Sequence, residues 1–191
     1  MRERLLQLVP EFDLIKDHEL REKTIHVWEV AMERGGWTPD TLLLMPFTLL
    51  INPCPANFVE HVRAVTLTAY RAAQLFGEIY GERVPINMDY LLAGGLLHDV
   101  GKLLEYEYRG DLTFQTPYGA LMRHPFSGAA LAYEFGLPME VQHMIAAHAG
   151  EGDKLKRSPE ATLINKADFA SFETLRDLQI KKTPTARMAD G

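Results

Sequence analysis

The stretch Leu96-Leu97-His98-Asp99-Val100-Gly101-Lys102 places a histidine and an aspartate side by side in an otherwise apolar segment. A buried, ionised carboxylate is costly unless it is paired with a charge or bound to a cation. Imidazole beside carboxylate offers two ligands to a divalent transition metal. The pair His98-Asp99 therefore predicts a metal centre inside the fold.

The segment around this pair, from 87 or 89 to about 104, is apolar nearly all round, which predicts the central helix of the fold. Gly94-Gly95 are poor helix formers, and we expect them to let a neighbouring helix approach closely. Lys102 follows His98 by four positions and Asp99 by three, so all three side chains can project toward one side.

Elsewhere a 3.6-residue apolar periodicity is common and strand signals are scarce, which predicts an all-α bundle. Residues 105–116 are polar and rich in turn formers, so we expect a loop there, beside the site. Capping residues, prolines and glycines predict helices over Asp17 to Arg34, from Asn57 to about Tyr80, from Thr116-Pro117, from His124-Pro125 to Gly136, from Pro138 to about His148, and from Ser158-Pro159 onward.

Four further side chains with metal-ligating atoms fall on or beside the inward faces of four different predicted helices: His61, His124, His148 and Asp168. Each has an ordinary structural explanation when taken alone, such as a core histidine bonded to a carbonyl. Their coincidence around one central pair favours a shared site. Three histidines fall on other faces and are predicted to be solvent-facing or packing residues: His18, His26 and His143.

The order His61, His98-Asp99, His124, His148, Asp168 resembles the HD superfamily of metal-dependent phosphohydrolases, with His98-Asp99 as its namesake pair. Further matches are Gly101-Lys102 after that pair, Gly128-Ala129 after His124-Pro125, and Ile145-Ala146-Ala147-His148 before a glycine-rich turn. The resemblance implies an HD-domain helical bundle. We expect a metal-binding domain over residues 57–172, an N-terminal helical extension over 1–56 packed on it, and a C-terminal tail over 173–191 that frays from about Thr183.

The resemblance also implies a ligand set. By position, four side chains correspond to the ligands of the simplest members: His61, His98, Asp99 and Asp168. His124 and His148 correspond to the additional ligands of members that hold two metals, with Asp99 bridging the ions. Such ligands suit iron, manganese, zinc, nickel or cobalt better than magnesium or calcium, and the number of ions stays open.

A pair of divalent ions about 3.5–4 Å apart activates water and stabilises in-line displacement at phosphorus. The leading hypothesis is therefore a phosphohydrolase that cleaves a phosphomonoester or phosphodiester of a nucleotide or another small phosphate ester. Asp99 and Lys102 are its predicted catalytic residues, with Lys102 binding a phosphoryl oxygen. A salt bridge from Lys102 to Glu105 or Glu107 is the structural alternative, and Arg123 is a weaker phosphate-binding candidate.

Two other functions stay open. The six-ligand pattern also resembles the mixed-valent diiron oxygenases of the same superfamily. Measurements of iron content and oxygen uptake would distinguish such an oxygenase from a hydrolase. A non-catalytic nucleotide-sensing or partner-binding protein is the third possibility, although an intact ligand set argues against it. The sequence is silent on the substrate and on the oligomeric state.

Composition narrows the partners and the compartment. A chain of 191 residues, 47% of them hydrophobic, suffices for one compact domain. A net charge of −6 argues against a sequence-independent grip on a nucleic-acid polymer. The longest apolar run, Leu42 to Ile51, is too short to cross a membrane, and no signal-peptide pattern is visible. The single cysteine, Cys54, cannot form an intrachain disulfide, which indicates a reducing compartment. Together these features lead us to expect a soluble, cytoplasmic protein.

Overall fold

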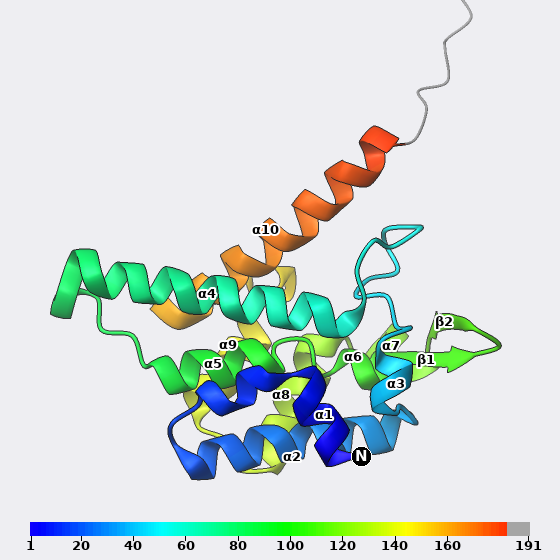
Figure 1. Cartoon of the computed structure of the whole chain (residues 1–191), viewed down its shortest axis with the longest axis horizontal. Coiled ribbons are helices and arrows are strands. Elements are labelled where there is room, and N and C mark those ends of the chain that lie inside the picture. The colour runs from blue at the N-terminus through cyan, green and yellow to red at the C-terminus, as the bar shows by residue number, and fades with distance from the viewer. Residues whose placement is uncertain (183–191) are drawn as a thin grey trace, which may run out of the picture.

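The helix that leads into the His98-Asp99 pair lies at the centre of the fold. In the computed structural model, which describes residues 1–182, every residue from Leu91 to Val100 is buried. The predictions of an all-α fold and of a central helix are confirmed (Figure 1). This helix, α5 (Met88–Leu97), packs against α2 (His18–Gly35), α4 (Phe58–Tyr80), α9 (Met139–Ala147) and α10 (Pro159–Lys182).

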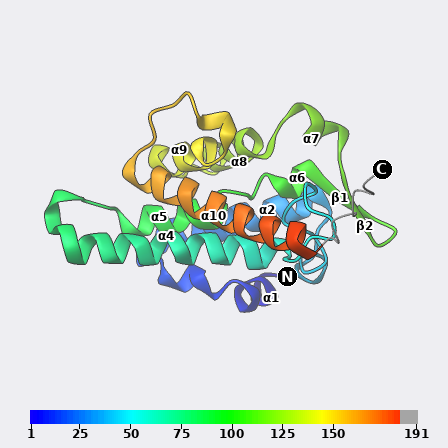
Figure 2. The ribbon, with the colours of Figure 1, turned by 90° about the horizontal axis from the view of Figure 1, so that it is seen from above.

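The other described elements are short. Figure 1 shows α1 (Arg2–Leu8) and α2 on one side of α5, with α4 and α10 on the other. Figure 2 shows α8 (His124–Glu134) and α9 on the opposite side of α10 from α4. These shorter elements are α1 (Arg2–Leu8), η1 (Pro10–Leu14), α3 (Pro39–Leu42), η2 (Gly81–Arg83), α6 (Lys102–Glu105), β1 (Tyr106–Arg109), β2 (Leu112–Gln115), α7 (Pro117–Leu121), α8 (His124–Glu134) and η3 (Gly150–Gly152).

The helix ends follow the capping residues of the sequence. The Asp17 side chain accepts a hydrogen bond from the backbone N–H of Leu20 at the start of α2. Asn57 and Glu60 form a reciprocal capping box at the start of α4. At its far end, α4 extends beyond the body of the protein (Figure 1), and the apolar side chain of Ile79 is 59% exposed there.

The predicted helix to Leu104 was wrong in one respect, because the chain leaves the α-helix between Leu97 and Lys102. Here the backbone N–H of Val100 donates to the Leu97 carbonyl and that of Lys102 to the Asp99 carbonyl, both three residues back. In such a 3₁₀-like turn, residues i and i+3 lie on the same side. The tightened turn therefore brings Asp99 and Lys102 onto one face.

Two tryptophans of the N-terminal region support this turn. The indole Nε1 of Trp28 donates to the Leu96 carbonyl at 2.8 Å, and that of Trp37 donates to the Leu103 carbonyl at 2.9 Å. Carbonyls at a helix end lack partners within the helix, and buried ones need a donor. The N-terminal region thus holds the segment that carries His98 and Asp99 from both ends.

The predicted loop over residues 105–116 is largely a β-hairpin. Strands β1 and β2 pair antiparallel, with Tyr106 opposite Gln115. Gly110 and Asp111 have φ values of 54° and 67°, which suit the two-residue turn of a tight hairpin. The turn was located correctly, but strands of four residues are too short to show a clear alternation.

The division of the chain into residues 1–56, 57–172 and 173–191 stays a prediction. Helix α10 crosses position 173 without a break, so part of the expected tail is helical. The predicted fraying from Thr183 concerns residues outside the described part.

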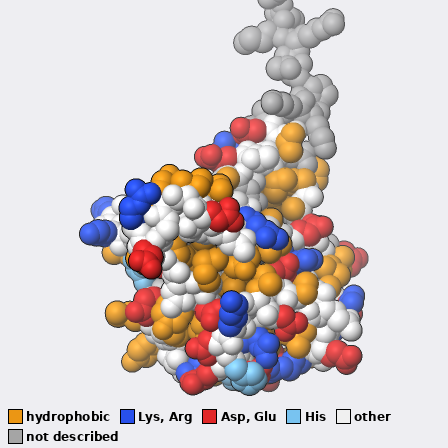
Figure 3. Space-filling view, turned by 60° about the vertical axis from the view of Figure 1, so that its left-hand side comes forward, with side chains coloured by type: hydrophobic (Ala, Val, Ile, Leu, Met, Phe, Trp, Pro, Cys, Tyr) orange, Lys and Arg blue, Asp and Glu red, His pale blue; other side chains and the backbone are white. Residues whose placement is uncertain are grey.

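Within residues 1–182, no helix combines the length and apolar character that a membrane span requires. The face in Figure 3 mixes basic and acidic side chains.

Gly101 allows a close approach between two elements of the site. A Cβ at this position would lie 2.2 Å from the His124 carbonyl oxygen and 2.5 Å from Ser127 Oγ. We expect Gly101→Ala to lower the free energy of unfolding by about 1–3 kcal/mol, measured by chemical denaturation. Gly77→Ala, in α4, is the control. No atom of a neighbouring element lies within 4 Å of its Cβ position, so this variant should be at least as stable as the wild type. Equal denaturation midpoints for Gly101→Ala and the wild type would contradict the prediction.

Candidate metal centre

The side chains predicted to converge do so around Asp99, whose side chain is 1% exposed. His61 comes from α4, His98 from the turn after α5, His124 from the first turn of α8, and His148 from the end of α9. The Nε2 atoms of these four rings lie 3.3–3.5 Å from the Asp99 carboxylate oxygens. Four parts of the chain therefore each bring one imidazole to the same carboxylate.

The two oxygens of Asp99 face different pairs of histidines. Oδ2 lies 3.4 Å from His61 Nε2 and 3.5 Å from His98 Nε2. Oδ1 lies 3.3 Å from His124 Nε2 and 3.5 Å from His148 Nε2. In each group of one aspartate and two histidines, the ligating atoms lie within 4.8 Å of one another. The arrangement offers two adjacent cation positions that share Asp99.

Asp168 joins the first of these groups from α10. Its Oδ1 lies 3.1 Å from His61 Nε2, and its side chain is 17% exposed, unlike the fully buried Asp99. Asp168 is thus the carboxylate on the open side of the site.

The hydrogen bonds of the rings show which nitrogens face the centre. His98 Nδ1 lies 2.6 Å from the Gly95 carbonyl oxygen, and His148 Nδ1 lies 2.7 Å from that of Ile145. A carbonyl oxygen only accepts, so Nδ1 carries the hydrogen and the neutral ring turns a bare Nε2 lone pair inward. The lone pairs of His98 and His148 therefore point at Asp99 oxygens, which also only accept.

Such a convergence of acceptors is unfavourable without a cation between them. The buried Nε2 atoms of His61 and His98 have no hydrogen-bond partner among residues 1–182. His124 Nε2 also lies only 3.3 Å from His148 Nε2. A divalent metal would satisfy all of these atoms, so the residues present fit the group that the sequence predicted.

The protonation states of several groups suit metal binding. Burial lowers the pKa of His98 to about 4, so its ring is neutral at pH 7. Burial opposes ionisation of Asp99, but the nearby charge of Lys102 and the surrounding histidines together outweigh it and lower the Asp99 pKa. For Asp168, burial opposes ionisation, but the nearby rings of His61 and His98 together outweigh it and lower the pKa to about 2. Neutral imidazole and ionised carboxylate are the forms that ligate metals.

Lys102 lies inside the site. Its Nζ donates to Asp99 Oδ2 at 2.7 Å and to the Phe47 carbonyl at 2.8 Å. The alternative salt bridges to Glu105 or Glu107 are not formed. Burial alone would lower the Lys102 pKa, but Asp99 raises it, so the ammonium stays charged.

Sequence reasoning missed two residues that shape the site. Glu105 is fully buried, and its Oε2 accepts hydrogen bonds of 2.9 Å from both the backbone N–H and Nδ1 of His124. Phe47 stacks on His61, with ring centroids 4.3 Å apart and planes tilted by 20°. Neither residue belongs to a motif. For Glu105, the signal available in the sequence was a carboxylate that directly follows Leu103-Leu104, seven positions after His98.

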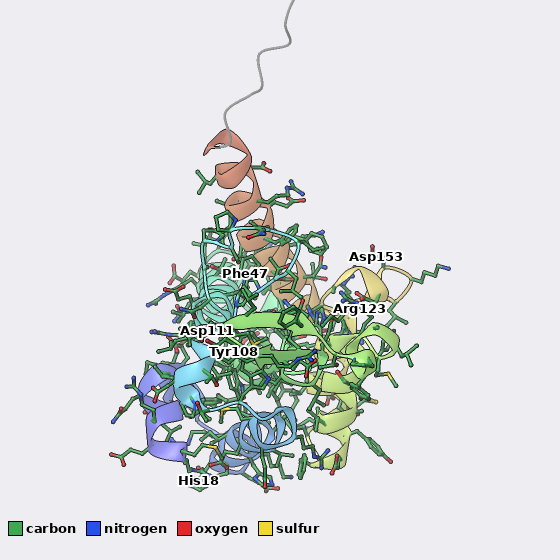
Figure 4. All side chains as sticks on the ribbon, turned by 90° about the vertical axis from the view of Figure 1, so that its right-hand side faces the viewer. His18, Phe47, Tyr108, Asp111, Arg123 and Asp153 are labelled. Atoms are coloured by element: carbon green, nitrogen blue, oxygen red, sulfur yellow. The ribbon has the colours of Figure 1, made fainter. Side chains whose placement is uncertain are left out.

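A cavity of about 410 Å³ opens onto the centre. Asp99, Lys102, His124 and Asp168 line its inner part. In Figure 4, Phe47 and Arg123 lie on different sides of this region. Arg123 donates to Glu105 and Glu151, and is therefore anchored at the rim.

The three histidines predicted to lie elsewhere do so. His18 is exposed, and the His26 side chain is 53% exposed. His143 Nε2 accepts a hydrogen bond of 3.2 Å from the backbone N–H of Ser158, outside the cluster around Asp99.

Comparisons with known proteins place the chain in a family. The family model described as "HD domain" matches residues 58–171. The dihydroneopterin 2',3'-cyclic phosphate phosphodiesterase of Methanocaldococcus jannaschii is 31% identical over 190 residues, covering 94% of this chain and 72% of that protein. Ribonuclease Y of Desulforudis audaxviator is 40% identical over 138 residues, covering 71% of this chain and 22% of the ribonuclease. No solved structure gives a significant match.

The chain belongs to the HD domain family. It is a phosphohydrolase, since the family is one of hydrolases and the relatives are a phosphodiesterase and ribonucleases. HD domains bind divalent metals, and the groups around Asp99 are able to do so.

The position of Asp99 between two pairs of histidines predicts how metal binding fails. We expect Asp99→Asn to remove most of the bound metal, because the amide is uncharged and replaces one of the two ligating oxygens by an NH2 group that only donates. Elemental analysis of the purified protein measures this, with circular dichroism as a check of folding. His143→Ala should keep the wild-type metal content, because His143 lies outside the cluster. Unchanged metal content in folded Asp99→Asn protein would rule out a metal at Asp99.

Proposed function

We propose that this protein hydrolyses a 2',3'-cyclic phosphate on a small molecule that carries a heterocycle. One observation carries the proposal: the two oxygens of Asp99 face separate pairs of histidines beside a cavity that also contains Lys102. The geometry supports two cation positions next to space for a small phosphate ester. The substrate class is drawn from the phosphodiesterase relative, which shares almost the whole chain.

In this proposal His61, His98 and Asp168 would hold one ion, His124 and His148 would hold the other, and Asp99 would contribute to both. Mixed histidine and carboxylate ligands favour iron, manganese, zinc, nickel or cobalt. When bound, such ions supply Lewis acidity that polarises phosphoryl oxygens and acidifies water.

The chain's own residues bind and orient the substrate. Lys102 has a fixed position, because its ammonium is tethered to Asp99 and the Phe47 carbonyl, and it lines the cavity. We assign it the role of meeting a phosphoryl oxygen as a point charge. In the reaction, the oxygen of water forms a bond to phosphorus and one ester P–O bond breaks. The leaving alkoxide takes up a proton, and a phosphomonoester results.

The extent of the similarity favours a small substrate over RNA. The match to the phosphodiesterase covers 94% of the chain, so it includes the cavity-lining residues 47–50 of the N-terminal region. The ribonuclease Y matches cover 72% of the chain or less, and only about a fifth of those proteins. The net charge of −6 also disfavours binding of a polyanion.

The alternatives from the sequence are less well supported. The relatives named above are a phosphodiesterase and ribonucleases, which favours hydrolysis over oxygenation. The six predicted ligands converge, and five of them are buried, which favours catalysis over a vestigial site.

The substrate proposal is tested with dihydroneopterin 2',3'-cyclic phosphate and protein loaded separately with Fe²⁺, Mn²⁺, Zn²⁺, Ni²⁺ or Co²⁺. We expect at least one metal to support conversion to a phosphomonoester, followed by chromatography and phosphorus NMR. Oxygen consumption is recorded in parallel and should be zero above the protein-free control. Conversion that requires oxygen would instead establish the oxygenase, and no conversion with any metal would reject this substrate class.

Replacing Lys102 by methionine tests its catalytic role separately from metal binding. We expect Lys102→Met to keep the bound metal but to lower kcat about 10²-fold, because one preorganised charge at the phosphoryl group is lost. Lys166→Met changes an exposed lysine of α10 and should retain wild-type kcat. Wild-type kcat in Lys102→Met protein would show that Lys102 is only a structural partner of Asp99.

A further inference from the structure

We propose that Glu151 and Arg123 together bind the edge of the substrate's heterocycle and select a 2-amino-4-oxopyrimidine ring, the ring system shared by pterins and guanine. This inference rests on the proposed function, because it names the part of the substrate that lies away from the phosphate. Neither residue is a predicted metal ligand.

The cavity beside the metal centre has an apolar wall and a polar end. The apolar wall comes from the segment before α4 and from α10: Phe47, Leu49, Leu50, Phe169 and Phe172. The polar end comes from β2, from the residue before α8 and from η3: Gln115, Arg123 and Glu151. In Figure 4, Arg123 lies on the side of Asp153, away from Phe47. A planar ring with one polar edge matches these surroundings, because its faces can meet apolar side chains while its edge meets charges.

Arg123 is fixed before any ligand binds. Its Nη1 donates to the fully buried Glu105, and its Nε donates to Glu151 Oε1 at 3.2 Å. Nη2 has no hydrogen-bond partner among the described residues, and the Arg123 side chain is 43% exposed. The guanidinium therefore presents a free donor from an anchored position.

Glu151 provides acceptors next to this donor. Its side chain is 24% exposed, and Oε2 has no side-chain partner within the described part of the chain. The pair thus presents the open Oε2, the second lone pair of Oε1, which already accepts from Arg123 Nε, and one guanidinium NH2 group that donates. The complementary ligand edge has two adjacent N–H donors followed by an acceptor.

This edge distinguishes between heterocycles. A 2-amino-4-oxopyrimidine ring offers its amino group, its ring N–H and its oxo oxygen in that order. Adenine offers an amino group beside a ring nitrogen that carries a lone pair, which would face a carboxylate oxygen and repel it. A site that hydrogen-bonds a polar edge rejects the unmatched ring strongly, since its own charges stay unpaired.

The test compares guanosine and adenosine 2',3'-cyclic phosphates, which share the reacting group and differ in the edge. We expect the metal-loaded full-length protein to show a kcat/KM at least about 10-fold higher for the guanosine compound. Glu151→Gln should lower kcat/KM for guanosine by about 10-fold or more, while that for adenosine changes less than about 3-fold. Metal content should stay at the wild-type level in this variant.

Two further variants sharpen the test. Arg123→Lys keeps the positive charge but removes the planar donor, so it should reduce the same preference. Glu107→Gln is the matched control, because Glu107 pairs with Arg109 on the hairpin and does not line the cavity. It should retain the wild-type ratio of the two substrates.

A binding measurement makes the inference independent of turnover. Calorimetry with guanosine and adenosine 3'-monophosphates should show tighter guanosine binding, and Glu151→Gln should abolish the difference. Equal affinities of both nucleotides for the wild type, or a difference unchanged in Glu151→Gln, would overturn the inference. If neither cyclic phosphate nor the pterin compound is hydrolysed, the proposed function fails, while the binding data still decide the role of Glu151.

Discussion

The burial of the Asp99 carboxylate is the constraint on which the rest of this structure depends. An ionised carboxylate in an apolar core is tolerated only with compensating positive charge. Lys102 supplies one such charge at 2.7 Å, and four imidazoles turn their Nε2 atoms toward the remaining lone pairs. Because those nitrogens are acceptors when neutral, the arrangement is complete only with cations between them. The helices are therefore packed around an ionic centre as well as around an apolar core.

The N-terminal region contributes directly to this centre. The indoles of Trp28 and Trp37 hold carbonyls on both sides of the turn that carries Asp99. Phe47 covers His61 with its ring and holds Lys102 with its carbonyl. A relative that matches only the domain over 58–171 need not share these contacts, whereas one that matches nearly the whole chain includes them. The N-terminal region therefore shapes the site beyond the segment that the family model matches.

Much of the fold and the converging histidines could be predicted because they follow local rules. The starts of α2 and α4 depend on capping residues within three positions, and the inward faces depend on helical periodicity. Phe47 could not be predicted, because its contacts with His61 and Lys102 span 14 and 55 positions without a repeated pattern. The break after Leu97 was also hidden, since an apolar run looks alike in an α-helix and in a 3₁₀ turn.

The four histidines are oriented in two different ways. His98 and His148 donate to carbonyls three residues back, so the backbone of their own segment fixes them. His61 and His124 face side chains instead, Ser171 Oγ at 3.2 Å and Glu105 Oε2 at 2.9 Å. Each cation position then combines one ring fixed by the backbone with one fixed by a side chain. Since Glu105 also anchors Arg123, a single buried carboxylate joins the orientation of a predicted metal ligand to the group proposed to contact the substrate. In the proposed site, Glu105 therefore couples metal geometry to substrate recognition, and a change there is expected to affect both.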